Sequence, residues 1–91
     1  MTKLEQLKID MKQEYDKYKS LYRTLSNQKD MIDGCLNRIA ISDDEQEVER
    51  YYNALINHSI NEYKDTARKT HRQWLVYNNL FDEYAKVKNN D

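Results

Sequence analysis

The spacing of apolar residues in the first forty positions constrains the fold of this chain more than any other feature. From Leu4 to Ile39, steps of three and four residues alternate without a slip. This is the a/d pattern of a helix that packs lengthwise against another helix. Thr2 and Glu5 form a T-x-x-E capping box, so we predict a helix from about residue 3 to residue 40. The positions of this first stripe are Leu4, Leu7, Met11, Glu14, Tyr18, Leu21, Leu25, Gln28, Ile32, Cys35 and Ile39.

A second helix is predicted directly after the first. Ser42 and Glu45 form another capping box with acidic neighbours, which places a turn at 41–42 and a helix from about 43 to 88. Ser59 with Glu62 offers one more start signal, so a break near His58 would give a three-helix bundle instead. Beyond residue 87 nothing apolar remains, and residues 88–91 are expected to fray. The second stripe begins with steps of four, like a coiled-coil stutter, and comprises Val48, Tyr52, Ile56, Ile60, Tyr63, Ala67, Thr70, Trp74, Tyr77, Phe81 and Tyr84.

The fold class follows from these stripes and from the lack of turn-forming residues. The chain of 91 residues has no proline and one glycine, Gly34, which we expect to mark a close backbone approach or a mild bend. We predict a single all-α domain over residues 1–91, a long antiparallel, coiled-coil-like helical hairpin. Two such helices bury too little apolar surface to offset the entropy of ordering them, so the hairpin is expected to associate into a larger bundle.

Apolar residues that lie outside the two stripes indicate where a partner binds. Tyr15 and Tyr22 widen the apolar side of the first helix, while Leu75 and Val76 point away from the second stripe. We predict that these side chains contact another protein or a second copy in a homodimer. The predicted partner-binding residues are Ile9, Tyr15, Tyr22, Tyr51, Leu75, Val76 and Leu80.

Basic residues support an alternative function, the binding of nucleic acid. Lys64, Arg68 and Arg72 recur every four residues and therefore line one helix face, and Lys12 and Lys19 occupy corresponding levels of the first helix. These five side chains are the candidate phosphate contacts. Against this alternative, acidic residues are interspersed among them and the net charge of the chain is -1.

No motif in the sequence predicts catalysis, a metal or a cofactor. His58 and His71 are too far apart to share one helix face at ligand spacing, and no nucleophile stands beside a base. Glu14 on the first stripe is interpreted as half of an internal ion pair with Lys69 or His71. An enzyme would require a pocket that Glu14 forms with Arg23 and Gln73. We predict that the protein is not an enzyme and has no catalytic, cofactor-binding or metal-binding residues.

The outline of the chain resembles two families of small helical proteins, without matching their motifs. It is similar in length to the secreted helical hairpins of the WXG type, but Ala40, Ile41, Ser42 and Asp43 stand where their Trp-x-Gly turn would be. The all-helical chorismate mutases are also of this length, and the resemblance implies an active site with several arginines on facing helices. Arg23, Arg38 and Arg50 do not match that arrangement, so an enzyme of this type is kept as a second alternative.

The remaining features concern location and origin. The N-terminus carries charges every few residues, and no stretch of about 20 apolar residues could span a membrane. Cys35 has no second cysteine to pair with, which favours a cytoplasmic protein. The abundance of Lys, Asn, Tyr, Ile and Asp favours a low-GC bacterium or phage as the source. The leading hypothesis is a cytoplasmic, non-catalytic protein-binding module that acts as an adaptor, assembly factor or small inhibitor.

Overall fold

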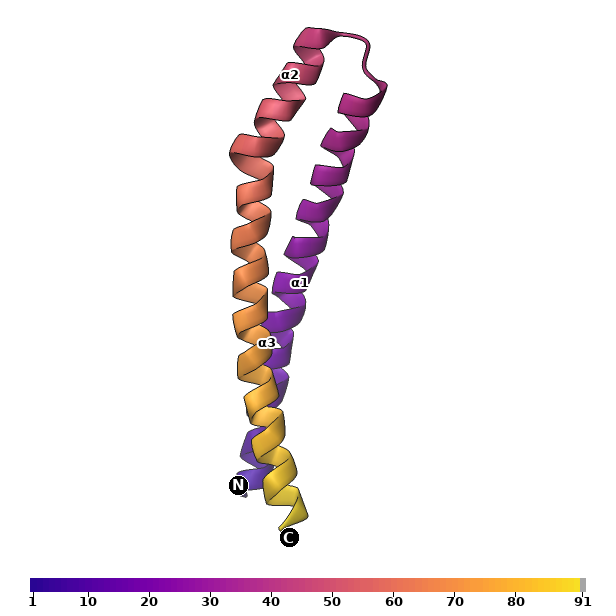
Figure 1. Ribbon diagram of the computed structural model, residues 1–91. Helices are drawn as coiled ribbons and strands as arrows, with labels where there is room; N and C mark the ends of the chain where they lie inside the picture. The colour runs from indigo at the N-terminus through magenta and orange to yellow at the C-terminus, as the bar shows by residue number, and fades with distance from the viewer. Residues whose placement is uncertain (91) are drawn as a thin grey trace. The chain divides into compact units, whose positions relative to one another are not determined.

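The computed structural model describes residues 1–90, all of them in helices or short connections (Figure 1). Helix α1 spans Lys3–Ile41, α2 spans Glu45–Ala54, the π-helical segment η1 spans Leu55–Ser59, and α3 spans Ile60–Asn89. The chain reverses direction between α1 and α2, so α1 is antiparallel to the helices that follow it. The prediction of an all-α antiparallel helical hairpin is confirmed, while its association into a bundle stays a prediction.

Helix α1 begins and ends close to the predicted residues. The Thr2 hydroxyl accepts a hydrogen bond from the Glu5 backbone N–H at 3.1 Å, which is the Thr2 half of the predicted capping box. Gly34 lies inside α1 without a positive φ, and a Cβ atom added there would meet nothing within 4 Å. The expected close backbone approach at Gly34 is therefore wrong, because this position faces open space.

The connection between α1 and α2 occupies residues 42–44 rather than the predicted 41–42. Asp44 is the N-cap of α2, and its carboxylate accepts from the Gln46 backbone N–H at 3.0 Å. Ser42 accepts instead from the Asp44 backbone N–H at 3.2 Å. The capping box predicted for Ser42 and Glu45 is wrong, because the Asp44 carboxylate lies nearer to the unpaired amides of the first turn.

No turn interrupts the chain near His58, so the three-helix alternative is wrong. The backbone keeps helical dihedral angles at Ala54 (φ -62, ψ -42) and at Ile60 (φ -67, ψ -41). The Ile60 N–H donates to the Leu55 carbonyl five residues earlier, which widens this turn into a π-helix. Steps of four residues overshoot an α-helical turn of 3.6 residues, and the wider turn absorbs the excess. The stutter in the sequence therefore appears as η1.

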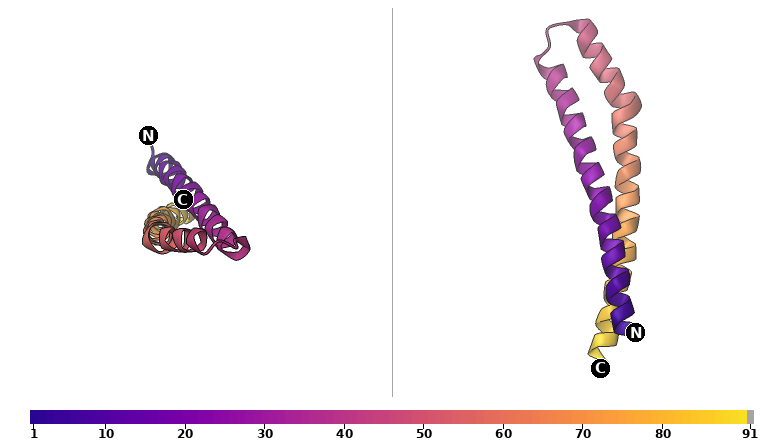
Figure 2. Two further views of the ribbon diagram at one scale, coloured as in Figure 1. Left: turned by 90° about the horizontal axis from the view of Figure 1, so that it is seen from above. Right: turned by 180° about the vertical axis from the view of Figure 1, so that it is seen from behind.

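The chain divides into two compact units, which are described separately. Unit 1 comprises Met1–Tyr22 and the chain from Lys69 onward, and unit 2 comprises Arg23–Arg68. In unit 1, the first part of α1 and the last part of α3 lie side by side and antiparallel in both views (Figures 1 and 2). Unit 2 contains the rest of α1, the connection, α2, η1 and the start of α3.

The inner side of α1 agrees with the sequence pattern, whereas the predicted stripe of the second arm is wrong at Tyr52, Ile56, Trp74 and Phe81, which are exposed. Every position of the first stripe is buried or half-buried. On the second arm, Gln73 and Leu80 are half-buried, and Trp74 and Phe81, the predicted stripe residues, are exposed. From Thr66 to Tyr84 the inner positions of α3 still alternate in steps of four and three. The prediction placed the bulkier of two adjacent residues on the inner side, Trp74 and Phe81. In the structure Gln73 turns inward instead, because its side-chain amide donates to Glu14 of α1.

Both units have thin cores. Leu7 in unit 1 and Leu55 in unit 2, each 5% exposed, are the buried apolar side chains within residues 1–90. Thr70 and Thr66 are also buried in units 1 and 2 respectively, and each has an interaction partner. A small, partly polar interior supplies little hydrophobic stabilisation, so surface burial by a partner would add substantially to it.

Candidate functional site

Five aromatic rings join the two helices of unit 1. The Tyr18 and Trp74 ring centroids lie 5.2 Å apart, and those of Tyr15 and Tyr77 lie 5.3 Å apart, so each pair links α1 to α3. Trp74 also contacts Tyr77 at 5.7 Å, and Tyr22 contacts Tyr18 at 6.0 Å. Such pairs contribute about 0.5–1.5 kcal/mol each beyond their buried area. The rings therefore hold α1 and α3 together where the aliphatic core is thin.

Three of these rings and Phe81 are exposed on one side of unit 1, and we call this surface the aromatic face: Tyr15, Tyr22, Trp74 and Phe81. Trp74 is 41% exposed and Phe81 is 48% exposed. Phe81 lies on the same side of α3 as Trp74, because seven residues make about two helical turns. Aromatic side chains offer about 150–250 Å² each, so the four expose on the order of 350 Å². This area is typical of the largest apolar patch on a soluble monomer, which is often a functional surface.

The α1 border of the aromatic face is basic. Lys8, Lys12 and Lys19 lie on the same side of α1 as Tyr15, at steps of seven, three and four residues. The Lys19 ammonium lies 5.2 Å from the Tyr15 ring centroid and also pairs with Asp16 at 3.7 Å. Among the described residues of unit 1, no carboxylate stands three, four or seven residues from a member of the aromatic face. The face therefore presents aromatic rings beside positive charge.

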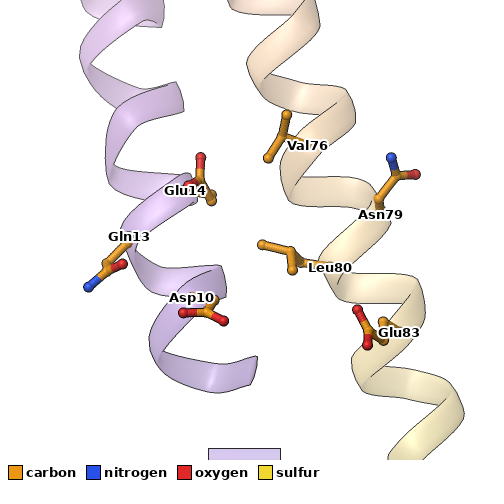
Figure 3. A pocket seen from close by; sticks show the side chains of 7 residues that line it. All are labelled: Asp10, Gln13, Glu14, Val76, Asn79, Leu80 and Glu83. Atoms are coloured by element: carbon orange, nitrogen blue, oxygen red, sulfur yellow. The ribbon is translucent and has the colours of Figure 1, made fainter. Parts of the chain in front are cut away.

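A groove of about 430 Å³ lies on the opposite flank of unit 1 (Figure 3). Val76 borders it, and two helical residues after Trp74 turn the side chain through about 200°, away from the aromatic face. The groove combines carboxylates and amides with two aliphatic side chains. Its lining residues are Asp10, Gln13, Glu14, Val76, Asn79, Leu80 and Glu83. Within residues 1–90, no group of three or more His, Cys, Asp or Glu side chains is arranged to hold a metal ion.

Glu14 is the groove residue with the most contacts. The Gln73 side-chain amide donates to the Glu14 carboxylate and, at 2.9 Å, to the Glu14 backbone carbonyl. The Lys17 ammonium donates to the same carboxylate at 3.1 Å. The Gln73 hydrogen bond, followed by that from Lys17, lowers the pKa of Glu14 below 4.5, against a smaller opposing effect of desolvation. Glu14 is therefore ionised and fully engaged at neutral pH.

The predicted partner of Glu14 was wrong by about one helical turn. Gln73, rather than Lys69 or His71, faces Glu14. Two features move the residue that faces Glu14 further along the chain. The connection lies at 42–44, later than predicted, and the π-helical turn takes up one extra residue. Of the three residues suggested for an enzyme pocket, Glu14 and Gln73 meet in unit 1, while Arg23 belongs to unit 2. A carboxylate with a lowered pKa is poorly matched to proton transfer at neutral pH.

The predicted partner-binding residues differ in their exposure. Ile9, Tyr15, Tyr22, Leu75 and Val76 are exposed, whereas Leu80 is half-buried along the groove and Tyr51 is half-buried in unit 2. Sequence reasoning missed Trp74 and Phe81, which it had assigned to the inner stripe. The sequence contains a second series of alternating steps, which passes through Gln73 and Leu80. A stripe drawn along that series predicts that Trp74 and Phe81 lie on the outer side of the helix.

The predicted phosphate contacts are all exposed, but they are spread over the molecule. Lys12, Lys19 and Arg72 belong to unit 1, while Lys64 and Arg68 belong to unit 2. Arg72 precedes Trp74 by two residues and therefore points to a different side of α3. Of these five cations, Lys12 and Lys19 border the aromatic face.

Two further observations complete the description of the site. Cys35 is a free, half-buried thiol, and no helix of residues 1–90 is long and apolar enough to cross a membrane. The chain matches no protein-family model, no curated protein and no solved structure.

Proposed function

We propose that this chain is a non-catalytic protein-binding module, an adaptor, assembly factor or small inhibitor, which binds its partner through the aromatic face. One observation carries this proposal. In unit 1 the large apolar residues Trp74 and Phe81 are exposed, while the smaller or polar residues Thr70 and Gln73 are turned inward. A helix arranged for its own hairpin alone would place the two large rings inside.

The size of the aromatic face fits this role. Covering about 350 Å² of apolar surface yields about 9 kcal/mol at 25 cal/mol per Å², before the costs of association are subtracted. Tryptophan and tyrosine are enriched among the residues that dominate binding energy at protein interfaces. Three members of the face, Tyr15, Tyr22 and Trp74, are held by ring contacts to Tyr18 or Tyr77, so they lose little side-chain freedom on binding.

The location of this activity is part of the proposal. We assign it to the cytoplasm, because a free, half-buried thiol such as Cys35 suits a reducing compartment. The groove of unit 1 is not needed for this function, and its carboxylate Glu14 is engaged by Gln73 and Lys17. The proposal therefore includes no reaction and no cofactor.

Site-specific photocrosslinking tests the proposal directly. A photoreactive benzoylphenylalanine is introduced at position 81 in one variant and at position 82 in a matched control, and the chain is irradiated in cells. Phe81 and Asp82 are both exposed, but adjacent residues of a helix point about 100° apart. We expect protein adducts at position 81, identified by mass spectrometry, and few or none at position 82.

Two outcomes would contradict the proposal. Equal adducts at both positions, or none at position 81, would mean that the aromatic face is not a binding surface. Adducts of nucleic acid at position 81 would favour the alternative in which Lys12 and Lys19 contact phosphates while the rings stack on bases. That alternative also requires affinity that falls steeply with salt concentration.

A further inference from the structure

Unit 2 has an exposed surface whose charge is opposite to that of the aromatic face. We call it the acidic face: Glu45, Glu49, Tyr52 and Ile56. Tyr52 is 53% exposed and Ile56 is 43% exposed, and both carboxylates are exposed. Steps of four, three and four residues place the four side chains on one side of α2 and the first turn of η1. No basic residue stands three, four or seven residues from Tyr52.

The acidic face repeats the spacing of the basic border of the aromatic face. Lys8, Lys12, Tyr15 and Lys19 are also separated by steps of four, three and four residues. If Glu45 of one chain is set opposite Lys8 of another, Glu49 falls opposite Lys12 and Tyr52 falls opposite Tyr15. The Glu45–Lys8 pair and the Glu49–Lys12 pair are then separated from each other by about 6 Å along the helix axes. Charge and aromatic positions match at three of the four places in this register, and the fourth sets Ile56 opposite Lys19.

We propose that the partner bound by the aromatic face is a second copy of this chain, whose α2 lies along α1 with its acidic face inward. This inference rests on the proposed function and names the occupant of the site. In this arrangement one amphipathic helix of the second copy lies on a surface made by two helices of the first. The ridges of α1 and α3 in unit 1 supply that surface.

Reciprocity makes the pair more favourable than a single contact. Every copy carries both faces, so each copy can offer an acidic face to one contact and an aromatic face to another. One helical stretch of 15 residues, 10 from α2 and 5 from η1, is about 22 Å long. Two such contacts bring the buried surface toward the roughly 800 Å² per partner that stable complexes need.

A charge-swap experiment tests this inference on the full chain. One variant carries Lys8→Glu and Lys12→Glu, and the other carries Glu45→Lys and Glu49→Lys. Each variant alone would oppose like charges, so we expect its self-association to weaken by about tenfold or more. An equimolar mixture restores opposite charges at both contacts, so we expect mixed pairs at close to the wild-type affinity, measured by sedimentation velocity.

Matched controls and a folding readout keep the result unambiguous. Lys86→Glu in α3 and Asp30→Lys in α1 change exposed charges outside the two faces, and we expect wild-type association from both. Circular dichroism reports whether Glu45→Lys weakens the start of α2, where a positive charge opposes the helix dipole. Recovery in the mixture itself requires both variants to be folded.

The outcomes separate this inference from the proposed function. Unchanged self-association of the charge-reversed variants, or no recovery in a mixture of helical variants, would overturn the contact between the two faces. A monomeric wild-type chain whose position 81 crosslinks to another protein would overturn self-recognition and leave the binding module intact. Crosslinking to nucleic acid, or to nothing, would overturn both.

Discussion

Units 1 and 2 are parts of the same hairpin, but the polar side chains of the first stripe differ in whether they have a hydrogen-bond partner. In unit 1, Glu14 is paired with Gln73 from α3. In unit 2, the side-chain oxygen of Gln28 is buried without a hydrogen-bond partner among the described residues. Within the part of the chain that the structure describes, each unit buries one leucine and one threonine, so the cores are equally thin. The difference shows that the specialised features lie in polar pairing and on the surface.

The surfaces of the two units differ in the same way. Unit 1 exposes aromatic rings beside lysines, whereas unit 2 exposes Tyr52 and Ile56 beside glutamates. Both units carry charges of both signs over the rest of their surfaces, and Lys19 itself pairs with Asp16. The opposite signs of the charges that border the two faces nevertheless favour recognition between copies, because complementary potentials steer partners together and oppose incorrect ones.

The largest expected change in the free energy of unfolding comes from shortening the two buried leucines, one in each unit. Leu7→Ala and Leu55→Ala should each lower the free energy of unfolding by about 3 kcal/mol, because each removes a buried side chain and leaves a cavity. Hydrogen exchange measured residue by residue should show reduced protection mainly in unit 1 for Leu7→Ala and mainly in unit 2 for Leu55→Ala. Uniform loss of protection along the chain in both variants would mean that the two units do not behave separately.

A smaller effect sharpens the contrast between the two glutamines. Gln28→Met removes a buried oxygen that lacks a partner and keeps a similar shape, so it should raise the free energy of unfolding by about 1 kcal/mol. Gln73→Met should lower that free energy, because it removes the donor to the Glu14 carboxylate. Urea denaturation measures the free energy of unfolding of both variants. A change of the same sign in both would contradict the proposed difference between the two glutamines.

The smallest expected effect is a pH dependence confined to unit 1. The pKa of Glu14 is lowered in the folded state by the Gln73 and Lys17 hydrogen bonds. Its contribution is therefore present above the ordinary carboxyl pKa and is lost as pH falls through the lower pKa of the folded state. Glu14→Gln should remove this part of the acid sensitivity, and urea titrations below pH 4.5 would detect it. An identical loss of stability on acidification in the variant would contradict the assignment.

Much of the fold followed from the sequence, because helical periodicity is a local property. The stripe of α1 from Leu4 to Ile39 was correct at every position, and Thr2 marked the helix start. The stutter before Tyr63 indicated an irregularity, but its form depended on hydrogen bonding around Leu55 that spacing alone does not reveal. The later start of α2 likewise depended on which of several adjacent acids, Asp43, Asp44 or Glu45, would cap it.

The candidate site was less predictable, because it depends on which helix face turns inward. Hydrophobicity favoured Trp74 and Phe81 over Gln73 and Leu80, and both choices satisfied the same spacing. The structure resolves the choice through the Glu14–Gln73 pair, a contact between residues far apart in the sequence. The exposed rings were therefore identified only once the two arms of the hairpin were placed against each other.

The central claim, that a second copy of the chain covers the aromatic face, is tested most directly by iodide quenching of Trp74 fluorescence over a range of protein concentrations. Trp74 is the single tryptophan of the chain, so the signal reports this face alone. The account predicts that quenching decreases and emission shifts to shorter wavelength as the sedimenting mass rises from 11.1 kDa toward twice that value. Constant quenching by a monomer at every concentration would contradict it.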